Sequence, residues 1–378
     1  MKIAVLTGEP SGDLLAHSVI EAVQAQVSDL ELIGIGGERL AERGLRSRFP
    51  LSEFSLNGIA EVLPHLPRLL LRIEQITRWL LSEQPDVVLS VDAPDLTLRI
   101  AKALRHRGYR GKLVHLVAPT VWAWKPERAA SIAEFLDHVL CLFPFEPPYF
   151  EAHGLGATFI GHPIVSRPPP TQPKDPSALL LLPGSRMNEA RAMVPLFRAV
   201  VERLLPRFSG LRCVVPTVST TRGFVTANMG AWPTPIEFVF RAEDKQRAFE
   251  QAGTALAASG TVALELAQAE VPGVITYRLS ALSYARIMRQ TSLRHFSLIN
   301  ILANREVMPE RMQDRAEPDG LAEAVGVLLN DPAQRATQIE EQKQALARLA
   351  LPAGQSPAKL AADTLLTLIR AHRHDLRL

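Results

Sequence analysis

The chain opens with MKIAVLTGEPSGDLLAHSVIEAVQA (residues 1–25), which contains the complete pattern of a strand, a turn and a helix. Ile3–Leu6 is an unbroken apolar run, typical of a strand that is buried on both faces. The run ends at Thr7 and Gly8, and from Asp13 to Ala25 the apolar residues recur at helical spacing. A buried strand that leads directly into a helix predicts a parallel sheet covered by helices.

The same alternation of strand-like and helix-like stretches continues along the chain. The further strands predicted in the first half are Leu32–Ile35, Val87–Val91, Leu113–Val117, Val139–Phe143 and Ala157–Ile160. Those predicted in the second half are Ala178–Leu182, Cys213–Val215, Glu237–Phe240, Ala255–Ala258 and Gly273–Thr276. This pattern predicts the α/β fold class, with two Rossmann-like, doubly wound parallel sheets.

A proline-rich segment, Ser166–Pro173, separates the two halves. Consecutive prolines disfavour helix and stiffen the chain, so this segment predicts a linker of limited flexibility. The length of 378 residues suits two domains. We expect an N-terminal domain at 1–165, a linker at 166–176, a C-terminal domain at 177–355, and a final helix within 356–378 that could pack on either domain.

Composition excludes several classes of protein. With 47% apolar and 21% charged residues, the chain has the balance of a soluble globular protein. Cys141 and Cys213 lie far apart in apolar runs, which argues against a disulfide framework or a zinc site and fits a reducing cytoplasm. The net charge of +3 is small, and no basic run is interleaved with aromatics, so no nucleic acid partner is expected. Neither a secretory signal nor a membrane-spanning helix is expected, because the apolar runs are too short.

Ligands of open parallel sheets bind outside the carboxyl ends of the strands, and two such sheets are expected to face one central cleft. The first loop of this kind is Thr7–Asp13. Its two glycines allow close approach of the backbone to a ligand, and Ser11 and Asp13 are helix N-cap residue types. It matches neither the NAD nor the ATP signature. A tight turn with a cap would explain the glycines and the serine, but it would not explain Glu9.

Two further loops follow strands in the first half. Asp92 and Asp95 come at the end of a predicted strand, where a carboxylate held beside a hydroxyl can act as a general base. Asp95 is also well placed to cap the helix after Pro94, so Asp92 is the better candidate for the base. Trp122 and Trp124 lie in another such loop, where they could either pack or offer a surface to a sugar or an acyl chain.

In the second half, two loops are suited to a nucleotide. Leu182–Arg186 is a glycine-serine turn before a predicted helix that contains Glu189, and backbone amides with an adjacent arginine suit a pyrophosphate. Ser259–Thr261 offers a second helix start of this kind. Glu265 follows one helical turn later, where a carboxylate could accept from both ribose hydroxyls, although an exposed helix residue would also fit.

Taken together, these loops resemble the lipid-A-disaccharide synthase family of inverting glycosyltransferases, which has the two-Rossmann-domain (GT-B) fold. The matching stretches, in chain order, are Gly8–Asp13, Asn57–Leu63, Asp92–Asp95, Ala118–Trp124, Phe143–Glu146, Phe159–Pro163, Leu182–Arg186, Ser259–Thr261 with Glu265, and Ser297–Leu302. Each motif alone is weak, but the ordered set, which covers most of the chain, is highly specific.

The resemblance implies a reaction in which UDP-2,3-diacylglucosamine donates its sugar to the 6-hydroxyl of 2,3-diacylglucosamine 1-phosphate, giving a β-1,6 disaccharide and UDP. It implies Asp92 as the base, Arg186 at the nucleotide, Asn300 near the donor, and no metal ion or other cofactor. We therefore expect Asp92 and Glu9 in catalysis. The expected substrate-binding residues are Gly8, Ser11, Gly12, Asp13, Asp95, Trp122, Gly184, Ser185, Arg186, Glu189, Ser259, Gly260, Thr261, Glu265 and Asn300.

The sequence departs from the family pattern at Pro10, Met187 and Ile299. Pro10 and Met187 could narrow the site, which leaves the donor's acyl-chain preference open. The rival functions are another GT-B enzyme, such as a UDP-N-acetylglucosamine 2-epimerase or the peptidoglycan N-acetylglucosaminyl transferase, and a non-catalytic nucleotide-sugar binding protein. The epimerase would need further carboxylates and histidines in the cleft, where only His115 and His162 lie near loops. A protein that only binds would not need Asp92.

We expect a cytoplasmic enzyme. Because its expected substrates carry acyl chains, it would bind peripherally to the cytoplasmic face of the inner membrane. The sequence leaves open whether it is a monomer or a homodimer. Ile59–Trp79 could provide the contact, because it combines leucines, among them those of the segment Leu66–Leu71, with Arg68, Arg72 and Arg78. An ordinary helix that packs on the core would show the same pattern. The sequence leaves both interpretations of these leucines open.

Overall fold

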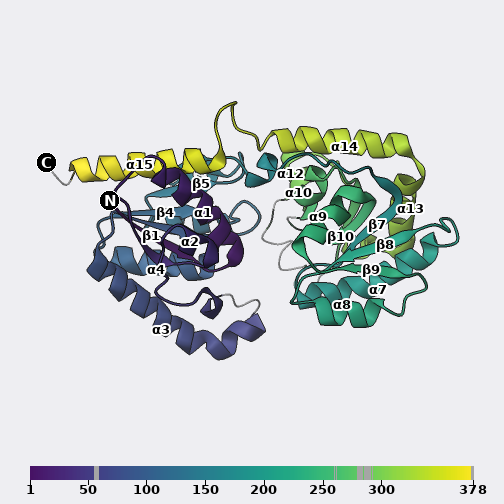
Figure 1. Ribbon diagram of the computed structural model, residues 1–378, viewed down its shortest axis with the longest axis horizontal. Coiled ribbons are helices and arrows are strands. Elements are labelled where there is room, and N and C mark those ends of the chain that lie inside the picture. Colours follow the sequence, from purple (N-terminus) through teal and green to yellow (C-terminus); the bar gives the residue numbers. More distant parts are fainter. Residues whose placement is uncertain are drawn as a thin grey trace. The chain divides into compact units, whose positions relative to one another are not determined.

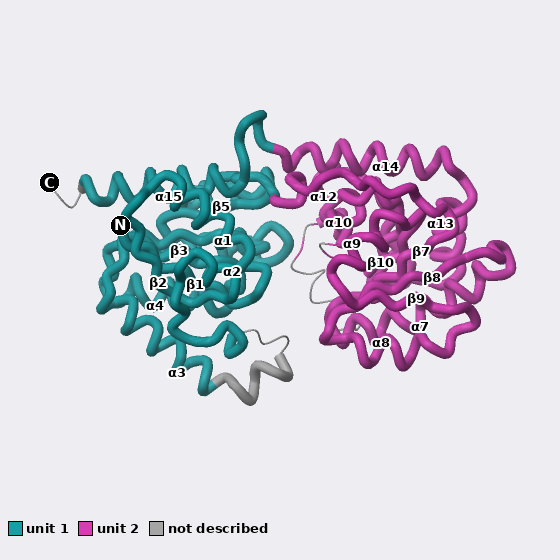
Figure 2. Tube along the Cα trace, viewed as in Figure 1, with its two compact units in different colours: residues 1–162, 351–378 teal, residues 163–350 magenta. Residues whose placement is uncertain are grey.

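The computed structural model describes residues 1–54, 59–258, 260, 262–278, 284, 291 and 293–375, with the side chains of 59–66 and 375 outside that description. The chain divides into two compact units (Figure 2). Unit 1 contains residues 1–162 and 351–378, and unit 2 contains residues 163–350. The prolines of Ser166–Pro173 therefore belong to unit 2, and the end of the chain returns to unit 1.

Unit 1 contains a six-stranded parallel sheet in the order β2-β1-β3-β4-β5-β6. Its strands are β1 (Lys2–Thr7), β2 (Glu31–Ile35), β3 (Val87–Val91), β4 (Lys112–Leu116), β5 (His138–Cys141) and β6 (Gly156–Phe159). Thr7 pairs with Val91, and Val91 pairs with Leu116. The carboxyl ends of β1, β3 and β4 are therefore level, and the loops that follow them lie side by side.

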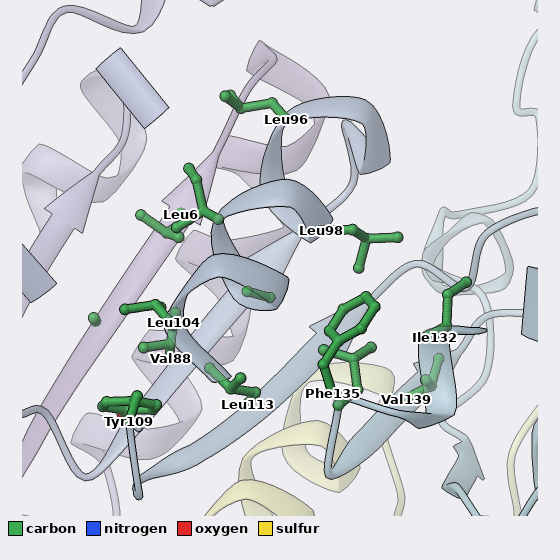
Figure 3. Close-up of a cluster of buried hydrophobic side chains, with 14 of the residues drawn as sticks. Leu6, Val88, Leu96, Leu98, Leu104, Tyr109, Leu113, Ile132, Phe135 and Val139 are labelled. Carbon is green, nitrogen blue, oxygen red and sulfur yellow. The ribbon is translucent and has the colours of Figure 1, made fainter. Parts of the chain in front are cut away.

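Helices cover both faces of this sheet (Figure 1). The helical segments of unit 1 are α1 (Pro10–Gln24), α2 (Glu38–Glu42), η1 (Leu51–Glu53), α3 (Ile59–Glu83), α4 (Pro94–His106), α5 (Arg128–Ala133), α6 (Pro147–Glu151) and α15 (Pro357–Asp375). α3 packs against α4, and α15 packs against α1. Figure 3 shows part of the core between α4 and the sheet, with Leu6, Val88 and Leu104 among its buried members.

Unit 2 contains a second six-stranded parallel sheet, in the order β12-β11-β10-β7-β8-β9. Its strands are β7 (Asp175–Leu182), β8 (Arg212–Pro216), β9 (Ile236–Val239), β10 (Ala252–Ala258), β11 (Gly273–Tyr277) and β12 (Glu310–Met312). The helical segments are η2 (Pro163–Ser166), α7 (Met187–Leu204), α8 (Arg222–Met229), α9 (Ala242–Gln251), α10 (Val262–Gln268), α12 (Leu298–Ala303), η3 (Gln313–Arg315), α13 (Pro318–Asn330) and α14 (Pro332–Ala347). A core formed with α7, α8 and α13 covers one face.

The predicted fold class of two doubly wound parallel sheets is confirmed. Each predicted strand is present, with ends shifted by up to three residues. β12 has no counterpart among the predicted strands, because Glu310–Met312 is too short and too polar to form an apolar run. α1 also begins earlier than its apolar pattern suggests. Pro10 occupies the first turn, where its fixed φ favours helix, and Glu9 is the N-cap.

Candidate functional site

In unit 2, a cavity of about 370 Å³ opens where β7, β8 and β10 end. Its lining comes mainly from the loops after these strands and from α9 and α10. The lining residues are Leu182, Pro183, Gly184, Ser185, Arg186, Glu189, Pro216, Thr217, Val218, Lys245, Phe249, Ala258, Gly260, Val262 and Glu265. Gly184, Ser185, Arg186, Glu189, Gly260 and Glu265, which the sequence predicted as binding residues, thus line one cavity.

The turn between β7 and α7 is fixed by a contact between Gly184 and Glu189. Gly184 has a φ of +104°, and a Cβ built on it would lie 2.6 Å from the Glu189 carboxylate. Glu189 accepts hydrogen bonds from the Arg186 backbone amide at 3.3 Å and from Arg186 Nη1 at 3.0 Å. A third bond comes from the Tyr277 hydroxyl at 3.1 Å. Only glycine therefore fits at 184, and Glu189 braces the turn.

Arg186 is far more exposed than Glu189, its partner in this ion pair. The exposed fraction of the side chain is 78% for Arg186 and 10% for Glu189. Arg186 is the N-cap of α7, a helix of 18 residues. The amides of the first helical turn have no partners inside the helix, and the helix dipole adds partial positive charge there. The mouth of the cavity thus combines a helix N-terminus with an exposed guanidinium, a combination suited to an anion.

Gly260 also lines the cavity, in the loop after β10. Its φ is +148°, and a Cβ built there would meet no atom within 4 Å. Glycine is therefore required by the backbone conformation, and the backbone faces open space where a ligand can approach. Its predicted neighbours, Ser259 and Thr261, lie outside the described residues.

Glu265 in α10 accepts a hydrogen bond from Lys245 Nζ in α9 at 2.8 Å. Lys245 also lies over the Phe249 ring, 5.3 Å from its centroid. No motif in the sequence marks Lys245 or Thr217, because α9 is an ordinary polar helix and Thr217 stands alone after its strand. The fold adds both to the lining of the cavity.

Asn300, predicted near the donor, is fully buried and does not line the cavity. Its Nδ2 donates to Met308 O and to Glu310 Oε1, each at 2.8 Å. Its Oδ1 accepts from the amides of Val307 at 2.8 Å and Met308 at 2.9 Å. These bonds tie α12 to the segment that leads into β12.

In unit 1, the carboxyl ends of β3 and β4 contain strained backbone. Asp92, Ala93 and Val117 have positive φ values of 52°, 44° and 75°. Such conformations are unfavourable for residues other than glycine, most of all for β-branched valine, and they concentrate at functional sites. The Asp92 amide donates to Leu116 O at 3.0 Å, and the Thr97 hydroxyl donates to Asp92 O at 2.8 Å. The half-buried Asp92 is thus presented on a firmly held turn.

The loop after β1 packs directly on this turn. A Cβ on Gly8 would lie 2.6 Å from Ala93 Cβ, and one on Gly12 would lie 3.3 Å from Val91 O and 3.7 Å from Asp92 Cβ. The structure therefore brings Gly8 and Gly12 together with Asp92. Glu9 is half-buried at the start of α1, and Ser11 is exposed in its first turn.

The other two predicted aspartates have different surroundings. Asp13 is only 3% exposed, and its two oxygens accept from the amides of Gly37 at 2.7 Å and Arg39 at 3.0 Å, which fixes the start of α2. Asp95 is exposed in the first turn of α4. The expectation that Asp95 caps this helix is wrong, because the N-cap is Ala93 and Pro94 already occupies the first position.

Trp122 is 8% exposed and lies in the loop after β4. Its indole N–H donates to Glu146 Oε1 at 3.1 Å, and its ring packs edge-on against Phe145 at 5.0 Å. Trp124 is more accessible, with Lys125 Nζ 4.7 Å from its ring centroid. Of the two tryptophans, Trp122 is thus anchored by packing. Nothing in the sequence predicts that its partner, Glu146, is buried.

Comparison with known proteins gives one consistent result. Residues 3–363 match the sequence model of the family described as "Lipid-A-disaccharide synthetase". A "Lipid-A-disaccharide synthase" from Rhodospirillum centenum is 44% identical over 97% of this chain and 94% of its own length. One from Paramagnetospirillum magneticum is 40% identical over 98% of both chains. The UDP-GlcNAc 2-epimerase of Neisseria meningitidis, solved with UDP-GlcNAc, shares the fold at 12% identity, with a TM-score of 0.64 over 97% of this chain and all of its own.

Proposed function

Because this chain belongs to the lipid-A-disaccharide synthase family and is therefore a hexosyltransferase, we propose how its two units divide the reaction between them. The enzyme transfers 2,3-diacylglucosamine from UDP-2,3-diacylglucosamine to the 6-hydroxyl of 2,3-diacylglucosamine 1-phosphate. Inversion at the anomeric carbon gives the β-1,6 disaccharide and releases UDP. Unit 2 binds the donor nucleotide, and unit 1 binds the acceptor.

The cavity of unit 2 is the observation that carries this proposal. The diphosphate lies against the first turn of α7 and the open backbone at Gly260, and Arg186 turns toward it from the rim. Arg186 and the α7 amides then stabilise the negative charge that grows on the diphosphate as the glycosidic bond breaks. Glu265, held by Lys245, accepts from the ribose hydroxyls with the lone pairs that remain on its carboxylate.

Asp92 is the general base. The bond between the acceptor O6 and the anomeric carbon forms as the bond between that carbon and the UDP oxygen breaks, and the proton of the 6-hydroxyl passes to the Asp92 carboxylate. The fixed turn supports this role, because it holds the backbone that carries the carboxylate in one place before the acceptor arrives. Glu9, whose loop packs on the same turn, serves as the second carboxylate beside the acceptor.

The acylated substrates call for contact with a membrane, and α3 provides it. Ile73, Ile76 and Leu80 are buried in the core, and Leu69 packs against it. Leu70 and Leu71 are 47% and 57% exposed. Arg68 and Arg78 are also exposed, by 63% and 76%. The two leucines enter the acyl boundary of the cytoplasmic leaflet while the arginines meet anionic headgroups.

Within the part of the chain that the structure describes, no helix has both the length and the apolar character needed to cross a bilayer. The leucines of α3 whose side chains are described divide into two groups, since Leu69 packs inward while Leu70 and Leu71 face outward. The proposed association with the inner membrane is accordingly peripheral.

Mass spectrometry of the products tests the proposed reaction directly. Incubation with both acylated sugars should yield the acylated disaccharide 1-phosphate and an equal amount of UDP. An epimerase would convert the UDP-sugar to an isomer of the same mass, and a peptidoglycan transferase would leave the acylated sugars unchanged. A protein that only binds nucleotide-sugars would release no UDP. Any of these three results would refute the proposal.

A further inference from the structure

Glu146 is a buried acid to which the proposed reaction gives no role. It follows β5 in the segment Phe143–Glu146 and is only 2% exposed. Among the ion pairs of the described residues, none includes Glu146. A buried carboxylate without a cation is costly, so its hydrogen bonds must compensate for lost solvation.

Both oxygens of Glu146 accept hydrogen bonds. Oε1 accepts from the Trp122 indole at 3.1 Å, and Oε2 accepts from the Phe143 amide at 3.0 Å. Around them, Phe143 and Phe145 stack at 5.4 Å, and Phe145 packs edge-on against Trp122. The carboxylate therefore joins the loop after β4 to the loop after β5.

The loop that contains Trp122 has strained backbone at both ends. Val117 has a φ of 75° and Lys125 has a φ of 56°. Strained conformations persist only where the surroundings determine them. Between these two residues Ala118, Val121 and Trp122 are buried, and Trp122 is the one whose side chain donates a hydrogen bond to Glu146. The loop begins directly after Leu116, whose carbonyl accepts the Asp92 amide. A shift of the loop would therefore change the surroundings of Asp92.

We propose that Glu146 is a positioning residue for the acceptor: it fixes Trp122 and, through Trp122, the loop 118–125 beside Asp92. This inference rests on the proposed function insofar as the acceptor binds next to Asp92. The bond between Glu146 and Trp122 is a property of the protein alone and can be tested without substrate.

The protonation state of Glu146 sets the strength of this anchor. A carboxylate accepts both N–H bonds, whereas a carboxylic acid has a hydrogen on one oxygen, which then faces a donor. Burial raises the pKa of Glu146 to about 7, against the lowering effect of its hydrogen bonds from Phe143, Trp122 and Leu142. The anchor is thus half-populated near pH 7, strengthens as the pH rises above that value and weakens as the pH falls below it.

The other titratable groups around this cluster are Cys141, Glu151 and His162. Cys141 on β5 interacts with Glu146 and with Glu151 on α6, but burial raises the pKa of its thiol far above neutrality. His162 packs against Phe143 with ring centroids 5.5 Å apart. A pH-dependent signal that disappears when either Glu146 or Trp122 is replaced can therefore be assigned to the Glu146 carboxyl and not to Cys141, Glu151 or His162.

Intrinsic tryptophan fluorescence tests the anchor in the protein without substrate. Between about pH 5.5 and 8.5, the wild type should show a transition with its midpoint near the pKa of Glu146. Trp122→Phe and Glu146→Gln should each abolish it. Trp232→Phe is the matched control, because Trp232 is also buried and donates its indole N–H at 3.0 Å, to Asn228 O in unit 2. This control should keep the transition. A transition that survives in Glu146→Gln would overturn the proposal.

Kinetics test the link to the acceptor. Glu146→Gln and Trp122→Phe should each raise the KM for the acceptor about tenfold, the expected effect of losing one buried charge-assisted hydrogen bond, with the KM for the donor unchanged. Their effects should not add fully in the double variant, since glutamine weakens the bond that Trp122 donates, by removing the charge and one acceptor oxygen, and Trp122→Phe removes that bond. Equal changes in both KM values would show a merely structural role and overturn the proposal. If Glu146→Gln does not fold, Glu146→Asp keeps the charge but is too short to reach both donors, and the same prediction for the two KM values applies.

The two experiments also separate this inference from the proposed function. A fluorescence transition without any transfer to the acylated sugar would refute the proposed function while supporting the Glu146–Trp122 bond. Transfer activity without the transition would refute the inference alone.

Discussion

Gly8 and Ala93 lie so close that a Cβ built on Gly8 would be 2.6 Å from the Cβ of Ala93. Real Cβ atoms do not approach one another to this distance, so the absence of a side chain at position 8 is what lets the loop after β1 rest on the turn after β3. That turn holds Asp92 in its left-handed conformation. The geometry of the proposed base therefore depends on a glycine in a different segment of the chain.

Gly8→Ala should lower kcat by about 100-fold, because displacing a catalytic group by about 1 Å can have an effect of that size. The unit should still fold, as measured by circular dichroism, because the loop can move outward. Gly320→Ala is the control, since a Cβ there meets no atom within 4 Å. Normal turnover of Gly8→Ala would show that the turn tolerates the displacement.

Asp92→Asn should reduce turnover by roughly 10²–10⁴-fold, the usual contribution of a general base. Asparagine adopts the left-handed conformation of Asp92 readily, so the substitution removes the base without disturbing the turn. The affinity for UDP should stay close to that of the wild type, because the nucleotide cavity lies entirely in unit 2. Retention of more than about a tenth of the activity would remove Asp92 from the mechanism.

Arg186→Ala should raise the Kd for UDP roughly 10–100-fold and also lower kcat, because the guanidinium faces charge that increases in the transition state. Arg186→Lys should recover only part of the loss, since an ammonium cannot form a planar, bidentate contact. Arg198→Ala is a matched control on the same helix, because Arg198 is also exposed and also forms an ion pair with a glutamate. Isothermal titration with UDP distinguishes the variants. Equal losses in both alanine variants would mean that the diphosphate lies elsewhere.

Replacing Leu70 and Leu71 with serine should reduce binding to vesicles that contain anionic lipid by more than about tenfold, since each buried leucine contributes about 1.5–3 kcal/mol. The melting temperature should change little, because both side chains are exposed. Val327→Ser, an exposed apolar residue of α13, is the control and should leave vesicle binding unchanged. A sedimentation assay measures the bound fraction. Unaltered sedimentation of the double variant would place the membrane contact elsewhere.

Arg373→Ala should destabilise the protein by about 1 kcal/mol at neutral pH. Arg373 Nε and Nη2 each donate to Asp86 at 2.8 Å, and the Lys2 amide donates to the same carboxylate at 2.7 Å. Burial acts to raise the pKa of Asp86, but these hydrogen bonds outweigh it and hold the pKa below its ordinary value. A depressed pKa stabilises the fold above the ordinary pKa, and this contribution is lost as the pH falls through the folded value.

The difference in stability between the wild type and Arg373→Ala should therefore be full above about pH 5 and diminish in acid. Denaturation at several pH values measures it. Lys359→Ala, which removes an exposed ion pair with Asp363 on the same helix, should cost only about 0.3–0.5 kcal/mol. A difference that grows in acid would contradict the assignment to Asp86.

The strands and the positions of the two loop clusters could be predicted because both depend on local sequence. Apolar runs such as Val87–Val91 are buried on both faces, and the loops that follow parallel strands must meet at one edge. Gly184 and Gly260 could be selected because a glycine in such a loop usually supplies a backbone conformation that residues with a side chain avoid. Their positive φ values agree with that selection.

Other parts of the candidate sites could not be predicted, because they depend on contacts between distant segments. Lys245 enters the cavity only because α9 packs beside α10, and Glu146 meets Trp122 only because β4 and β5 are neighbours. Asp13 and Asn300 are polar residues in loop-like positions, yet their side chains bind backbone amides. Sequence alone does not distinguish an amide of the protein from a ligand as the partner of such a group.

Because unit 1 includes both the first and the last segments of the chain, unit 2 can be completed before unit 1 during synthesis on the ribosome. Residues 1–162 emerge first, but α15, which packs against α1, is synthesised after all of unit 2 (Figure 1). At about 5–20 residues per second, α1, which ends at Gln24, waits roughly 15–70 s for α15, which begins at Pro357, and the face that α15 will cover is open to solvent meanwhile. Unit 2 is continuous in sequence and can finish folding meanwhile. The unit whose synthesis starts first is therefore the last to close.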